Sequence, residues 1–113
     1  MSERQKENAL KMSKLLKTLA QPIRLLIVCH LLEGELYAQE ITDSLGTTKG
    51  NISQHLTALL NQEIIERISN GNRNLYAIKD PRIKKLVQLM KELYCPDFKL
   101  ANPSKNHHKR RNL

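Results

Sequence analysis

The stretch TTKGNISQHLTALL at residues 47–60 predicts a helix with one apolar face and one small, uncharged face. Apolar side chains recur at the spacing of a core-facing helical stripe, at Ile52, Leu56, Leu59 and Leu60. The opposite face, which surface helices usually cover with Lys and Glu, carries Gly50, Asn51, Gln54, Thr57 and Ala58. Amides can pair with adenine in the DNA major groove, and small residues allow close approach. This helix therefore suits either DNA or packing within its own domain.

The segments on either side of this helix favour DNA. Residues 38–46 predict a short helix that ends at Gly46, a residue suited to the left-handed conformation of a tight turn. Two helices around such a turn form a helix-turn-helix unit, whose second helix enters the major groove. Residues 64–69 and 74–78 are β-prone runs on either side of an Asn-Gly pair, which is a strong hairpin signal. The predicted fold is mainly α with a small β-hairpin, a winged helix-turn-helix.

Three further helices are predicted around this unit. Pro22 begins a nearly continuous apolar helix that extends to Leu32 and should be the central core helix, surrounded on most sides and with Cys29 inside. Residues 3–19 and 81–94 both predict amphipathic helices, the second begun by an Asp-Pro pair. A chain of 113 residues buries only about two-thirds of its unfolded surface. The two apolar stripes exceed what one such core can absorb, so we expect a helical dimer.

Composition limits the class of protein. Residues 1–95 form the predicted DNA-binding and dimerisation domain, and residues 96–113 form a basic, disordered tail. The net charge of +8 favours a polyanionic partner, although half of it comes from Lys105, Lys109, Arg110 and Arg111. No apolar run is long enough to span a membrane and the N-terminus is too polar for a signal peptide, so we expect a cytoplasmic protein with free thiols.

Several separated motifs resemble the ArsR family of dimeric winged-helix repressors. They are residues 15–24 (LLKTLAQPIR), residues 31–35 (LLEGE), residues 53–56 (SQHL) and the wing at residues 70–73 (NGNR). The similarity covers roughly residues 10–95. It implies a helical dimer with a β-wing that binds operator DNA until an inducer releases it.

Two metal sites familiar in that family lack their ligands in this sequence. Tyr37 and Gln39 stand where one site has a Cys-x-Cys pair. Asp80 is present at the other site, but Arg82 occupies the His position and no His occurs between residues 80 and 95. A zinc or arsenic sensor of either type needs those ligands. The sequence therefore predicts no metal and no cofactor.

The two cysteines match a different branch of the family. Cys29 and Cys95, 66 positions apart, resemble the dithiol of the branch that includes BigR, SqrR and HlyU. Members of that branch are thiol switches, so the resemblance implies a homodimeric repressor that reactive sulfur species or an oxidant release from double-stranded DNA. Composition by itself would favour inert cysteines, because buried thiols react slowly.

The side chains expected to contact DNA lie on the helix at residues 47–60 and on the wing. Asn51 and Gln54 should read bases, whereas His55 is either a phosphate contact or a hydrogen-bonding residue at the core edge. Contacts to the backbone or the minor groove are expected from Thr48, Lys49, Ser53, Arg67 and Arg73.

A rival hypothesis keeps the winged helix without a sensor. The protein would then be a basic DNA-binding or protein-interaction module with inert structural cysteines and no inducer. An enzyme is not expected, because the sequence contains no carboxylate pair, no nucleophile with a nearby base and no metal constellation.

Overall fold

The computed structural model describes residues 1–97. Their elements follow in the order α1 (Glu3–Leu19), α2 (Pro22–Leu31), β1 (Leu36–Tyr37), α3 (Ala38–Leu45), α4 (Lys49–Asn61), β2 (Ile65–Asn70), β3 (Arg73–Ile78) and α5 (Pro81–Tyr94). Within this range, no helix combines the length and the apolar character needed to cross a membrane. The predicted tail, residues 96–113, lies outside the described residues from residue 98 onward.

The helix boundaries follow local cap chemistry. α3 ends at Gly46, whose φ of 64° is left-handed and whose N–H donates to the Thr42 carbonyl. Thr48 caps α4, so the predicted helix at residues 47–60 begins at Lys49. Asp80 caps α5 by accepting a hydrogen bond of 2.9 Å from the Arg82 N–H. The predicted helix-turn-helix unit is confirmed.

The predicted hairpin is confirmed, but the sheet has a third strand. β2 and β3 are antiparallel and joined by a two-residue loop, with Asn70 opposite Arg73 and Gly71 at a φ of 70°. β1 pairs with the other edge of β3, so the strand order is β1-β3-β2. A strand of two residues is too short to show an alternating sequence pattern, which is why only its tertiary pairing reveals it.

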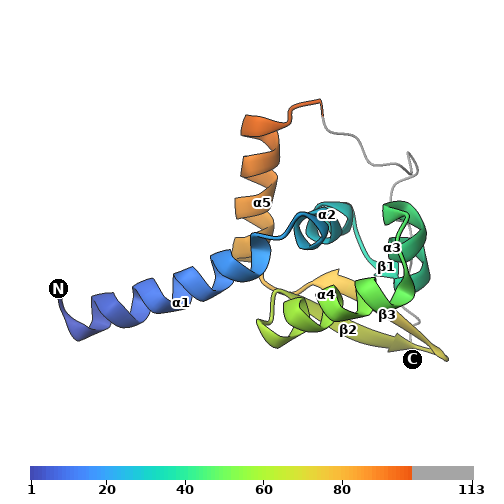
Figure 1. Cartoon of the computed structure of the whole chain (residues 1–113), viewed down its shortest axis with the longest axis horizontal. Coiled ribbons are helices and arrows are strands. Elements are labelled where there is room, and N and C mark those ends of the chain that lie inside the picture. The colour runs from blue at the N-terminus through green and yellow to red at the C-terminus, as the bar shows by residue number, and fades with distance from the viewer. Residues whose placement is uncertain (98–113) are drawn as a thin grey trace.

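The core gathers around α2, which lies at the centre of the fold (Figure 1). The predicted stripe on α4 is largely confirmed, since Ile52, Leu56 and Leu59 are buried while Leu60 is half-buried. The prediction that α2 is surrounded on most sides is confirmed, but the placement of Cys29 inside the core was wrong. One flank of this helix, formed by Leu25, Leu26 and Cys29, is only half-buried because α5 does not close over it.

α1 and α5 extend away from the body of the domain (Figure 1). Their outer faces keep large apolar side chains in contact with solvent, namely Leu10, Met12 and Leu16 of α1 and Leu86, Leu89, Met90, Leu93 and Tyr94 of α5. On α5 these residues recur at helical spacing and form one exposed apolar stripe, which is typical of an interaction site.

Candidate nucleic-acid interface and thiol pocket

The outer face of α4 is polar and exposed to solvent. Ser53, Gln54 and Thr57 are exposed there, together with Lys49 and Gly50 at the start of the helix. A Cβ atom built on Gly50 would meet no protein atom within 4 Å, so packing within the chain does not require glycine at this position. The face therefore has room for a closely approaching partner.

Thr48 and Asn51 hold the beginning of α4. The Thr48 hydroxyl accepts a hydrogen bond of 3.2 Å from the Asn51 N–H, as an N-cap does. The half-buried Asn51 amide donates to the Thr47 hydroxyl at 3.1 Å. Of the two amides predicted to read bases, Gln54 is thus the exposed one, and Asn51 makes a local contact that supports the helix end.

His55 lies at the edge of the core. It is half-buried, and its Nδ1 accepts a hydrogen bond of 3.1 Å from the Nε of Arg24 on α2. This is the core-edge hydrogen bond that the sequence allowed. Contact of the same ring with a phosphate stays a prediction.

Contacts with Tyr37 support the start of the wing, and the sequence did not reveal them. Arg67 and Arg73 are both exposed, as expected, but the Arg73 guanidinium also stacks 3.7 Å from the centroid of the Tyr37 ring. The Tyr37 hydroxyl accepts a hydrogen bond of 2.6 Å from the Asn70 amide. Tyr37 and Asn70 therefore fix the start of the wing, and their separation of 33 residues left no local sequence signal.

Both cysteines lie on one apolar pocket between α2 and α5. Its volume is about 310 Å³, and it is lined by Leu25, Leu26, Cys29, Val87, Met90, Lys91, Tyr94 and Cys95. Cys29 is half-buried, Cys95 is exposed, and both are free thiols. The fold thus brings together two thiols that are 66 positions apart in the sequence.

The pocket has opposing effects on the Cys29 thiol. Burial raises the pKa of Cys29, the Lys91 ammonium lowers that pKa, and the neighbouring Cys95 raises it. Burial dominates, so the pKa of Cys29 stays above its usual value. Lys91 nevertheless supplies the positive charge that favours a thiolate in an otherwise apolar site.

The described residues contain no group of three or more His, Cys, Asp or Glu side chains able to hold a metal ion. The chemistry that residues 1–97 offer at the pocket is therefore that of two thiols beside a cation.

Comparison with known proteins gives consistent matches. A family described as "Bacterial regulatory protein, arsR family" matches residues 21–67. The biofilm growth-associated repressor of Xylella fastidiosa is 31% identical over 99 residues, which cover 88% of this chain and 87% of that protein.

Two solved structures share the fold. Reduced HlyU from Vibrio cholerae superposes with a TM-score of 0.78 at 29% identity, over 83% of this chain and 99% of that one. The transcriptional repressor BigR from Xylella fastidiosa has a TM-score of 0.74 at 31% identity, over 84% and 98% of the two chains. The predicted winged-helix fold and the resemblance to this branch are confirmed.

Proposed function

Because the chain belongs to the ArsR family of bacterial regulatory proteins, we propose that it is a dimeric repressor whose operator binding depends on the state of Cys29 and Cys95. The observation that carries this proposal is the placement of both thiols on one pocket, between the core helix α2 and the projecting helix α5. The reduced protein binds DNA. A covalent link between the two sulfur atoms releases the protein from DNA.

DNA binding would use the exposed face of α4 and the wing. In a two-fold dimer the two α4 helices would lie about 34 Å apart, one turn of DNA, and read the halves of a near-palindromic operator. Gln54, and Asn51 if its local hydrogen bond opens, would contact base edges. Contacts to the phosphate backbone or the minor groove would come from Thr48, Lys49, Ser53, His55, Arg67 and Arg73.

The dimer would form through the projecting helices. Leu16, at 55% exposure, and Leu93, at 68%, would be exposed to water in a monomer. Burying the outer faces of α1 and α5 against a second copy removes this apolar surface from solvent at about 25 cal/mol for each Å². An isologous two-fold contact also gives the symmetry that a palindromic operator requires.

The proposed switch is a two-electron oxidation of the dithiol. One thiolate attacks the sulfane sulfur of a persulfide RSSH, displaces RSH and becomes a protein persulfide. The second thiolate then attacks the sulfur bonded to the first cysteine and displaces H₂S. The net reaction converts two protein thiols and RSSH into one disulfide, RSH and H₂S. If the protein persulfide first takes the sulfane sulfur of a second RSSH and displaces RSH, it becomes a hydrotrisulfide, Cys–S–S–SH. Attack of the second thiolate on the middle sulfur then displaces H₂S and leaves a trisulfide link.

The link would act on DNA through the helices that it joins. α2 belongs to the core beneath α4, whereas α5 belongs to the proposed dimer interface. Tying the half-buried Cys29 to the exposed Cys95 would draw α5 toward α2 and alter the separation of the two α4 helices. A change of that separation removes the match to one turn of DNA, so operator affinity falls.

A gel-shift on the DNA upstream of the chain's own gene tests this function. The reduced wild type should shift that DNA, and treatment with a low-molecular-weight persulfide should abolish the shift. Cys29→Ser and Cys95→Ser are the matched controls and should remain bound after the same treatment. A wild type that binds equally before and after treatment would contradict the switch.

A further inference from the structure

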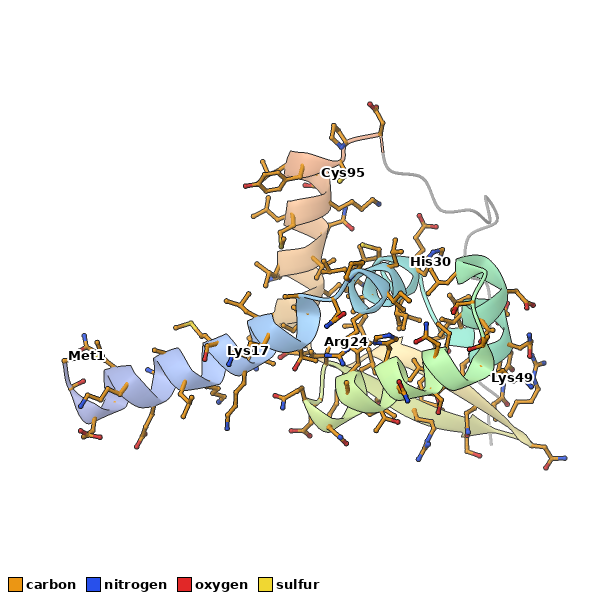
Figure 2. The ribbon with its side chains drawn as sticks, viewed as in Figure 1. Met1, Lys17, Arg24, His30, Lys49 and Cys95 are labelled. Atoms are coloured by element: carbon orange, nitrogen blue, oxygen red, sulfur yellow. The ribbon has the colours of Figure 1, made fainter. Side chains whose placement is uncertain are left out.

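Arg24 joins three helices through one guanidinium group. It is the third residue of α2, and its Nε–H donates to Nδ1 of His55 on α4 at 3.1 Å. Its Nη1 donates to the carbonyl oxygen of Thr18, in the last turn of α1, at 3.3 Å. Figure 2 shows Arg24 where the end of α1 meets α2 and α4.

Both hydrogen bonds of the Arg24 guanidinium should stabilise the packing of the three helices. The last carbonyls of a helix lack intrahelical partners and carry partial negative charge, so a cation there satisfies an acceptor and complements the helix dipole. Both hydrogen bonds are partly buried, which limits competition from water. A hydrogen bond from a charged donor is also stronger than one between two neutral groups.

The hydrogen bond also defines the protonation of His55. Arginine carries only donors and does not lose its proton in proteins, so Nδ1 of His55 must present a lone pair. While Nδ1 accepts this hydrogen bond, the ring hydrogen lies on Nε2. His55 follows Asn51 by one helical turn and Gln54 by one residue, at the edge of the exposed face of α4. An Nε2–H group is a donor, which is what a phosphate oxygen of DNA requires.

We propose that Arg24 is a positioning residue for DNA binding, which holds His55 as a phosphate donor and fixes α4 relative to α1 and α2. The proposal rests on the proposed function. Arg24 precedes Cys29 by five residues on the same helix, so any shift of α2 that accompanies the approach of α5 would also move the guanidinium that holds α4. Arg24 thus provides a direct contact between the thiol-bearing helix and the DNA-reading helix.

The first test reads the tautomer without DNA. In ¹⁵N-labelled wild type, the His55 ring should be neutral with its hydrogen on Nε2 and with Nδ1 accepting a hydrogen bond. Arg24→Met should yield a mixture of tautomers, whereas the control Lys17→Met, which removes an exposed cation from the last turn of α1, should leave the His55 signals unchanged. A wild-type signature that persists in Arg24→Met overturns the proposal.

The second test is a double-mutant cycle on operator affinity, with Arg24→Met, His55→Ala and both together. The probe is a duplex selected from a random-sequence pool by the reduced wild type. Arg24→Met should weaken binding about tenfold, a loss within the usual range for coupled residues. In the His55→Ala background the same change should cost at most about threefold. An equal loss in both backgrounds would mean that Arg24 does not act through His55, and would overturn the proposal.

A conservative variant and the DNA-free measurement separate a failure of the Arg24 proposal from a failure of the proposed function. Arg24→Lys keeps the charge but loses the planar fork, so it should fold and show an intermediate tautomer mixture even where Arg24→Met unfolds. If the wild type selects no duplex at all, the proposed function fails, and the tautomer measurement still decides whether Arg24 fixes His55. If the wild type binds and is released while Arg24→Met behaves identically, only the role of Arg24 is wrong.

Discussion

The proposed DNA-reading region (α3, α4, β2 and β3) and the projecting helices (α1 and α5) expose opposite kinds of surface. Within residues 1–97, every exposed large apolar side chain other than Met1 belongs to the projecting helices, and none belongs to the DNA-reading region. The DNA-reading region thus buries its own large apolar side chains and presents a polar face to a partner. The projecting helices keep apolar surface in contact with water until another apolar surface covers them.

The two regions also differ in charge. Residues 36–80, which contain the DNA-reading region, carry four Lys or Arg and five Asp or Glu. The projecting helices carry nine Lys or Arg and only three Asp or Glu. The face that would select a DNA sequence is therefore nearly neutral, so its contribution depends on hydrogen bonds and close approach more than on net attraction.

Breaking the apolar face of the projecting helices should give the largest effect. Replacing Leu16 and Leu93 with Glu places two carboxylates in the proposed interface, so the dimer should dissociate into folded monomers. Operator affinity should fall by about 100-fold or more, because each monomer then binds one half-site without the other. Sedimentation velocity at micromolar concentration measures the change. The control Asn8→Glu with Ser13→Glu adds the same charge at exposed polar positions of α1 and should remain dimeric. If the Leu16→Glu and Leu93→Glu variant also stays dimeric, the interface lies elsewhere.

Substitutions within the DNA-reading region should separate base reading from backbone contact. Gln54→Ala should cost about 1–3 kcal/mol on the operator and relax the preference at one base pair. Arg73→Ala should weaken binding to all sequences about equally and reduce the dependence on salt. Binding to a panel of single-base operator variants at several salt concentrations compares the two. Matching profiles would show that the exposed amide does not read a base.

The charge on α5 can be tested at the thiol pocket. Lys91 lowers the pKa of Cys29, so Lys91→Met should raise that pKa further and shift the pH profile of Cys29 alkylation toward higher pH. Near pH 8 the rate should fall about threefold or more, since one pKa unit corresponds to a tenfold change in thiolate. The measurement uses a Cys95→Ser background so that one thiol reacts, with Lys85→Met, at an exposed position of α5, as the control. Superimposable profiles for both lysine variants would remove Lys91 from the thiol chemistry.

The smallest expected effect lies at Gly50. An added methyl group meets no protein atom within 4 Å, so Gly50→Ala should stabilise α4 by about 0.5–1 kcal/mol and raise the melting temperature. If α4 approaches DNA closely at this point, the same variant should bind operator about two- to fivefold less tightly, since the methyl group takes space in the groove. Thermal melting and a binding titration on one preparation measure both effects. A gain in stability with unchanged affinity would mean that DNA does not approach Gly50.

Local chemistry explains which features the sequence revealed. The α4 stripe, the turn at Gly46 and the start of α5 at Asp80 depend on neighbours within a few residues, and all three were predicted. The Arg24–His55 hydrogen bond and the stacking of Arg73 on Tyr37 join residues more than 30 positions apart and left no local pattern. Their prediction would require the tertiary fold.

At the thiol pocket, the sequence indicated some features of the fold and concealed others. The apolar run of α2 correctly indicated a core helix, yet the same run concealed the half-buried flank at Cys29, because continuous hydrophobicity does not show which side is covered. The pairing of Cys29 with Cys95 followed from resemblance to a family branch. In the fold, the contact between α2 and α5 supplies the physical reason, since it places both residues on one pocket.

The most direct measurement is intact-protein mass spectrometry of persulfide-treated protein at the moment when it has released its operator. We expect the released fraction to carry an intramolecular Cys29–Cys95 link of two or more sulfur atoms, at the mass of a monomer without added RS groups. Peptide mapping should assign the link to these two residues, and reduction should restore DNA binding. A released fraction in which both thiols are unlinked would contradict the dithiol switch and favour a DNA-binding module with inert cysteines.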